Sequence, residues 1–165
     1  MARLAITRWL DDKKRNGASN GICGTVFHVS SISGQLPNLT TPLYVASKHG
    51  INGFVHSLGP LQKACGIRVV GVAPGLDPRK ETILPPEELA RAMMALVVES
   101  EKYKAGTILE VCDTEGRWRE VSAFNDPGPQ GPARPFSLCF DSAIDYLHTI
   151  TTALYEFMKQ ENGKE

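Results

Sequence analysis

The sequence has 165 residues, of which 42% are hydrophobic and 22% charged, the balance of an ordinary single globular domain. Its 18 basic and 18 acidic residues cancel, which argues against a nucleic-acid partner, whose phosphates need neutralising. No apolar run could cross a bilayer and no signal-peptide pattern opens the sequence, so we expect a cytoplasmic protein with no membrane partner. Four scattered cysteines, three of them in apolar surroundings, indicate buried free thiols in a reducing compartment.

Hydrophobic periodicity and stop signals divide residues 2–121 into alternating helices and strands. Gly59-Pro60 either kinks the second helix or ends it early, and the polar residues 113–116 can turn the third strand back into residues 118–121. Alternation of this kind is typical of an α/β fold with a parallel sheet and crossover helices. In chain order we predict a helix over 2–14, a buried strand over 25–29, a helix over 42–62, a buried strand over 67–72, a helix from Pro85-Pro86 to Val98 and a strand over 107–112.

The composition of the chain changes after residue 126. Residues 127–137 are rich in proline and glycine, which is typical of a linker. Beyond them the sequence predicts an amphipathic helix within residues 138–165, with one apolar stripe formed by Ile144, Leu147, Ile150, Leu154 and Met158. We therefore divide the chain into an α/β domain over 1–126, a linker and a C-terminal helix.

Ser31, Tyr44 and Lys48 form the strongest candidate site. A spacing of four places the phenol and the ammonium on the same helix face, one turn apart. A free tyrosine has a pKa of about 10, and a nearby cation lowers it by stabilising the phenolate, so the pair could serve as an acid/base. Ser31 follows the first strand and could donate to a substrate oxygen. Each feature alone has a plain structural explanation, because such pairs occur on solvated helices and serines are common in turns.

Four motifs in this order resemble the C-terminal part of a short-chain dehydrogenase/reductase. Within that family the sequence is most similar to the 15-hydroxyprostaglandin dehydrogenase-like branch. The motifs are Val29-Ser30-Ser31-Ile32-Ser33-Gly34, Tyr44-Val45-Ala46-Ser47-Lys48-His49-Gly50, Gly66-Ile67-Arg68-Val69-Val70 and Ala73-Pro74-Gly75. The resemblance implies a partial Rossmann-type, doubly wound, three-layer sandwich in which about three parallel strands remain and the first lies at the edge.

The resemblance also implies a function and a set of roles. Tyr44 would be the general acid/base, Lys48 would lower its pKa and contact the nicotinamide ribose, and Ser31 would polarise the reacting oxygen. Pro74 and Gly75 would line the nicotinamide pocket with backbone atoms. The reaction would be hydride transfer between a small secondary alcohol or ketone and NAD or NADP, with NAD slightly preferred. A homo-oligomer would form through the helices predicted over 2–14 and 42–62.

The sequence also departs from the family pattern. It contains no Gly-x-x-x-Gly-x-Gly phosphate loop and no Asn-Ala-Gly motif, and Arg79 stands where the family usually has a threonine. The alternative hypothesis is therefore a non-catalytic dimerising remnant, or a fragment. The histidines lack metal-ligand spacing, and we expect His28, in the first strand, to be a core histidine with satisfied hydrogen bonds. No Gly-x-Ser-x-Gly elbow or P-loop motif occurs, which argues against a serine hydrolase and a P-loop NTPase.

Overall fold

The computed structural model of the chain describes residues 2–16, 21–77, 82–113, 116–124 and 126–130. Within these ranges a four-stranded sheet in the order β1-β2-β5-β6 forms the centre of the fold, and its first three strands are parallel while β6 runs antiparallel to β5. The predicted α/β class, the parallel strands and the return of residues 118–121 are confirmed. The strands are β1 (Gly24–Val29), β2 (Ile67–Pro74), β5 (Ile108–Val111) and β6 (Arg119–Glu120).

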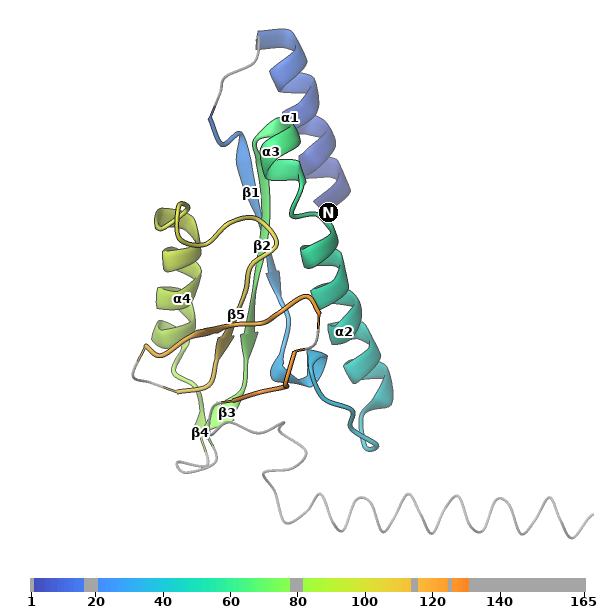
Figure 1. Cartoon of the computed structure of the whole chain (residues 1–165), viewed down its shortest axis with the longest axis vertical. Helices are drawn as coiled ribbons and strands as arrows, with labels where there is room; N and C mark the ends of the chain where they lie inside the picture. Colours follow the sequence, from blue (N-terminus) through green and yellow to red (C-terminus); the bar gives the residue numbers. More distant parts are fainter. Residues whose placement is uncertain (1, 17–20, 78–81, 114–115, 125, 131–165) are drawn as a thin grey trace, which may run out of the picture.

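Helices cover both faces of this sheet, so the fold has three layers (Figure 1). One core cluster includes Val55, Val69 and Ile108 and lies between the sheet and α2. The other includes Leu96 and Leu109 and lies between the sheet and α4. The helical elements are α1 (Ala2–Asn16), the short 3-10 helix η1 (Ile32–Gly34), α2 (Pro42–Ser57), α3 (Leu61–Cys65) and α4 (Pro86–Val98).

The predicted second helix is two helices. α2 ends at Ser57, and Pro60 is the N-cap residue of α3. Of the two effects that the sequence allowed for Gly59-Pro60, a kink or an early end of the helix, the structure has the early end. At the far end of α3 the chain turns into β2 through Gly66, which has φ +73. A side chain there would be strained by this φ and would also collide with the carbonyl oxygen of Gly21, so the tight turn requires glycine.

β1 is only half-buried, which corrects the prediction of a buried strand over 25–29. β1 pairs with β2 along one side and is the first strand of the sheet order, so its other side is an edge. Its last residue, Val29, is 46% exposed. In contrast β2 is flanked by β1 and β5, and its residues are buried up to Ala73 as the sequence predicts. Edge position, rather than apolar composition, therefore explains the different burial of the two strands.

The arginine in β2 is the largest fully buried side chain of the described fold. Arg68 is 1% exposed, and its Nη2 donates to the carbonyl oxygens of Leu96 (2.8 Å) and Tyr103 (2.6 Å). Burial lowers the pKa of Arg68, while the nearby charge of Glu101 opposes this shift. Leu96 lies in the last turn of α4, where carbonyls lack helical partners, so Arg68 caps this helix from the neighbouring strand.

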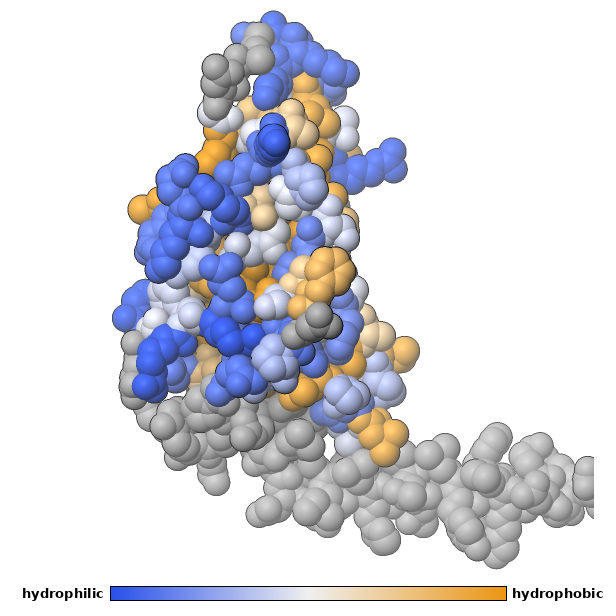
Figure 2. Space-filling model, viewed as in Figure 1, coloured by the Kyte–Doolittle hydropathy of each residue, from blue (hydrophilic) through white to orange (hydrophobic). Residues whose placement is uncertain are grey.

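α1 lies over the start of β1 and buries none of its residues. Its Lys13 Nζ donates to the carbonyl of Cys65 at 3.1 Å, which ties the helix to the end of α3. The predicted helix over 2–14 is confirmed and continues to Asn16. Figure 2 shows hydrophobic surface interrupting the hydrophilic cover along the side formed by α1 and α2. Exposed apolar residues on this side include Leu4, Leu43 and Phe54.

Several other predictions need correction or lie outside the described ranges. Cys112 is buried, but Cys23 and Cys65 are only half-buried, and all three are free thiols. The hairpin formed by β3 (Leu76–Asp77) and β4 (Thr82–Ile83) was not predicted from the sequence. Cys139, residues 131–137 of the linker and the predicted C-terminal helix fall outside the described residues. Within the described ranges no helix has both the length and the apolar character to cross a membrane.

Candidate active site

The candidate residues gather where the three parallel strands end. Ser31 follows the carboxyl end of β1, Pro74 closes β2, and β5 ends beside it because Pro74 pairs with Val111. α2 begins at Pro42, so Tyr44 lies in its first turn. Ligands in open α/β sheets bind outside the carboxyl ends of the strands, so the fold places these residues at the expected edge.

Tyr44 and Lys48 meet as their spacing predicts. The Lys48 Nζ atom lies 5.3 Å from the centroid of the Tyr44 ring, and it donates a 2.9 Å hydrogen bond to the carbonyl oxygen of Val29. The second contact anchors the ammonium to the last residue of β1. Tyr44 is 47% exposed, so its ring is accessible to a ligand while its neighbouring cation is held in place.

Ser31 has a structural task in addition to its proposed one. Its side-chain oxygen accepts a hydrogen bond from the backbone N–H of Ser33 at 3.1 Å, which caps the N-terminus of η1. Ser31 is only 8% exposed, and within the described ranges no hydrogen bond joins it to Tyr44 or Lys48. The structure thus brings Tyr44 and Lys48 together directly, and it holds Ser31 in the neighbouring turn.

Asn52 links this turn to α2, a connection that the sequence interpretation missed. The Ser30 hydroxyl donates to Asn52 Oδ1 at 2.5 Å, and Asn52 Nδ2 donates to the carbonyl oxygen of Gly34 at 2.9 Å. Asn52 is buried and lies four residues after Lys48, on the same face of α2. A polar residue continuing the face of Tyr44 and Lys48 was the available signal. A side chain at Gly34 would collide with Asn52, so the turn and the helix can approach this closely only with glycine there.

The backbone at the end of β2 is fixed by the sheet. Gly75 continues the ladder, because its N–H donates to the carbonyl oxygen of Val111 at 3.0 Å. Pro74 and Gly75 are partly exposed at this point, so their atoms border the carboxyl edge where the sequence predicts them. Arg79, the departure from the family pattern, lies outside the described residues.

His28 is not the satisfied histidine that the sequence interpretation expects. Its ring packs edge-on against Phe54 with the centroids 5.2 Å apart, and its buried Nε2 has no hydrogen-bond partner among the described residues. Burial lowers the pKa of His28, because the charged ring would lose its hydration. Across the described ranges no three metal-ligating side chains cluster as an ion site would require.

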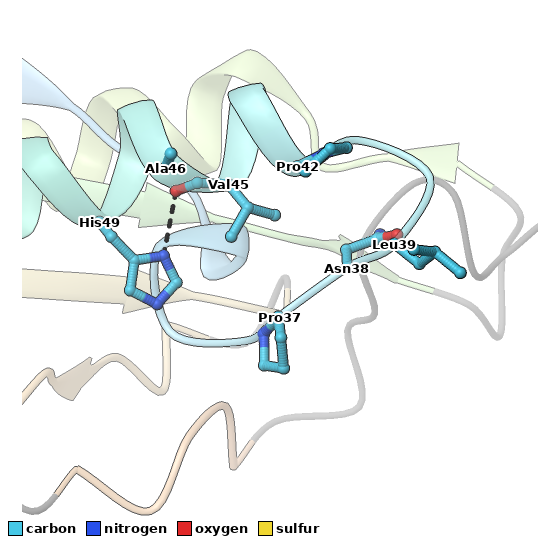
Figure 3. Close-up of a pocket in the computed structure, with 7 residues that line it drawn as sticks. All are labelled: Pro37, Asn38, Leu39, Pro42, Val45, Ala46 and His49. Carbon is cyan, nitrogen blue, oxygen red and sulfur yellow. Dashed lines mark hydrogen bonds between the residues drawn. The ribbon is translucent and has the colours of Figure 1, made fainter.

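An open, mostly apolar hollow of about 520 Å³ lies beside the first turns of α2 (Figure 3). The loop before α2 forms one side and α2 itself forms the other. Asn38 and His49 are its polar lining residues, and the Nδ1 atom of His49 is 3.0 Å from the carbonyl oxygen of Val45, which fixes the ring orientation. The lining residues are Pro37, Asn38, Leu39, Pro42, Val45, Ala46 and His49.

Comparison with known proteins identifies part of the chain. Residues 16–77 match the family model described as short chain dehydrogenase, a match within the N-terminal half of this chain. A short-chain dehydrogenase/reductase of Penicillium rubens is 31% identical over 115 residues, covering 62% of this chain and 39% of the relative. The 15-hydroxyprostaglandin dehydrogenase of Rattus norvegicus is 37% identical over 95 residues, covering 56% and 34%. The chain thus matches well under half the length of these relatives.

Solved structures are similar to this chain at the level of the fold. A short chain dehydrogenase from Mycobacterium avium superposes with a TM-score of 0.60 at 22% identity, over 88% of this chain and 50% of that one. A 4-hydroxyisoleucine dehydrogenase in complex with NADH and succinate gives 0.52 at 20% identity, over 67% and 50%. The parallel strands and the helices on both faces of the sheet therefore form a Rossmann-like fold.

Proposed function

We propose that this chain, a partial member of the short-chain dehydrogenase/reductase family, serves as an NAD(P)-dependent oxidoreductase acting on a secondary alcohol or ketone. The observation that carries the proposal is the Tyr44–Lys48 pair at the carboxyl edge of the sheet. Because the chain matches well under half of its relatives' length, the activity of a whole enzyme is part of the proposal. The match of residues 16–77 to the short chain dehydrogenase model and the similarity to a 15-hydroxyprostaglandin dehydrogenase support it.

Tyr44 is the proton-transfer group in this proposal. Lys48 is anchored by the carbonyl oxygen of Val29, so its ammonium stays beside the Tyr44 ring. Because Ser31 accepts from Ser33 with its oxygen, its own hydroxyl proton is left to donate to a substrate oxygen. The three groups would then give and take a proton at the reacting oxygen.

The described residues fit the nicotinamide end of NAD(P). Lys48 has three N–H donors and uses one on Val29, which leaves others for a ribose hydroxyl. The backbone of Pro74 and Gly75 borders the same edge. The cofactor, when bound, would supply or accept the hydride. We propose NAD rather than NADP on the similarity to 15-hydroxyprostaglandin dehydrogenase, which is NAD-dependent by name.

Removal of the phenol oxygen tests this function. Tyr44→Phe should abolish oxidation of secondary alcohols by NAD or NADP while leaving the far-ultraviolet circular dichroism unchanged. Tyr103→Phe is the matched control, because Tyr103 is a buried tyrosine between α4 and β5, away from the pair. Full turnover in the Tyr44 variant would overturn the proposal. Calorimetric titration of the chain with NADH and NADPH measures cofactor binding separately from chemistry.

The exposed side of α1 and α2 favours a second candidate function, a dimerising module without catalysis. α1 buries none of its residues, and Leu43 on α2 is 86% exposed. Figure 2 shows further hydrophobic surface along the side formed by these two helices. Exposed apolar surface on neighbouring helices can serve as an interaction site. We propose that two copies pair through these helices in the cytoplasm. Leu43→Glu should give a monomer by light scattering, whereas Leu39→Glu, an equally exposed leucine outside both helices, should not.

A further inference from the structure

The side chain of Arg119 joins two nearby segments of the chain to a third segment 84 residues away in the sequence. Its Nη2 donates to Glu110 Oε2 at 2.6 Å, its Nη1 donates to Asp126 Oδ2 at 2.8 Å, and its Nη2 also donates to Gln35 Oε1 at 2.7 Å. Glu110 belongs to β5, Asp126 to the segment after β6, and Gln35 to the end of η1. Figure 1 shows the segment after β5 crossing in front of the sheet toward η1 and α2.

The Arg119 cation forms ion pairs with two carboxylates, those of Glu110 and Asp126. Glu110 is 2% exposed and Arg119 is 25% exposed, so two carboxylates and one guanidinium share a poorly hydrated place. The hydrogen bond with Asp126 raises the pKa of Arg119 against the opposing effect of burial. Burial disfavours the Asp126 carboxylate, but hydrogen bonds from Arg119 and from the N–H groups of Ser122 and Gly128 lower its pKa. Arg119 and Asp126 are therefore both charged at neutral pH.

Asp126 also organises the segment that contains it. It accepts from the backbone N–H of Ser122 through Oδ2 and from that of Gly128 through Oδ1, each at 2.8 Å. The buried Glu110 accepts from the backbone N–H of Gln130 at 3.1 Å. The backbone of Ser122, Gly128 and Gln130 is thus held by the two carboxylates that bind Arg119.

The contact with Gln35 connects this cluster to the candidate site. Gln35 caps the C-terminus of η1 with its N–H on Ile32, and Ser31 caps the N-terminus of the same three-residue helix. The amide cannot flip, because its NH₂ would then face the Arg119 donors. The Gln35 Nε2 atom is buried without a partner among the described residues, so this side chain occupies its position despite an unmet donor. The hydrogen bond from Arg119 to its Oε1 atom holds it there.

We propose that Arg119 is a positioning residue that locks the η1 turn, and with it Ser31, against the segment after β6. The significance of this lock for catalysis rests on the proposed oxidoreductase function. Asn52 fixes the turn from the side of α2 through Gly34, and Arg119 fixes it through Gln35. The bidentate geometry requires a guanidinium, since an ammonium could not reach two carboxylates and an amide from one plane.

Hydrogen exchange of the full chain tests the lock without any need for activity. In Arg119→Gln, the amides of residues 33–35 should exchange about tenfold faster than in the wild type, because their local opening becomes easier. Arg117→Gln removes the same charge two residues away and should leave these amides unchanged, and Arg119→Lys should restore protection only in part. Equal exchange at 33–35 in the Gln variants at 117 and 119 would overturn the proposal.

A second variant covers the case in which Arg119→Gln loosens the whole fold, which exchange in β2 would reveal. Gln35→Leu removes only the acceptor and should still speed exchange at 33–35 while residues 122–130 keep their protection. Unchanged exchange at 33–35 in Gln35→Leu would overturn the lock. If the wild type turns over an alcohol, both variants should lower kcat by roughly tenfold to 100-fold with KM for the cofactor unchanged. An unchanged kcat would overturn positioning of Ser31, whereas an inactive wild type counts against the proposed function alone.

Discussion

Replacing Arg68 by methionine gives the most informative measurement of what holds this sheet to α4. Methionine has similar length and flexibility, so it can fill the space of the arginine stem without a large cavity. It cannot donate a hydrogen bond, however, and the carbonyl oxygens of Leu96 and Tyr103 would lose the donor they share. Each buried carbonyl left without a partner costs about 1–3 kcal/mol.

A second effect works in the opposite direction. Arg68 is a buried cation, and burial lowers its pKa, so methionine also removes an unfavourable desolvation. The guanidinium faces carbonyl groups, and the opposing charge of Glu101 comes from an exposed side chain, so only part of that desolvation is offset. The loss of two hydrogen bonds exceeds this relief, and we expect Arg68→Met to lower the free energy of unfolding by about 2–4 kcal/mol.

Urea unfolding followed by circular dichroism measures this change directly. A shift of the midpoint with an unchanged slope reports stability alone. Arg8→Met is the control, since Arg8 is exposed on α1 and pairs only with a partly exposed Asp12. It should change stability by less than about 0.5 kcal/mol. An Arg68→Met variant as stable as the wild type would refute the reasoning, because it would mean that the two carbonyls need no donor.

Two further predictions concern Gly66 and His28. Gly66→Ala should destabilise the chain by more than about 1 kcal/mol in urea unfolding, because Gly66 has a positive φ and a side chain there would collide with Gly21. Gly50→Ala is the control, because Gly50 lies in α2 with open space around it, and it should stabilise the chain by up to about 1 kcal/mol. Equal effects would contradict the backbone argument. Burial lowers the pKa of His28 in the folded state below the value of about 6.5 that an unfolded histidine has. The free energy of unfolding of the chain should therefore fall as the pH drops below about 6.5, because the unfolded state binds the proton more readily. His28→Phe should flatten this dependence, and an identical pH profile in the variant would exclude His28 as its source.

Local sequence signals account for the elements and for one contact of the site. The spacing of Tyr44 and Lys48 fixes their proximity as soon as the segment is helical, and α2 provides that helix. The same reasoning located the parallel strands, because β-branched apolar runs and crossover helices have few alternatives. The helices, the strands and the Tyr44–Lys48 contact all depend on residues that are close together in the sequence.

The missed features depend on which segments meet in space. Arg68 is a polar residue in an apolar run, and nothing local indicates that the end of α4 would supply its acceptors. From the sequence, Arg119 would be placed on the surface of a short strand, because its contact with Gln35 joins residues that are 84 positions apart. Ser31 was interpreted by its chemistry alone, so its role as the cap of η1 was missed. Tertiary contact therefore explains these omissions better than weak propensity does.

If the chain is an enzyme that also dimerises, Val29 connects the proposed active site to the proposed dimer surface. Val29 is the exposed last residue of the half-buried strand β1, and its carbonyl oxygen anchors the Lys48 ammonium beside Tyr44. An edge strand of the sheet thus holds the charge on which the proposed acid/base depends. A second copy that covered α1, α2 and the neighbouring edge would restrain β1, and this would favour the bound position of Lys48. Binding of NADH should then strengthen as the chain concentration rises through the monomer–dimer range, and Leu43→Glu should remove that dependence. A constant affinity across this range would separate the two functions.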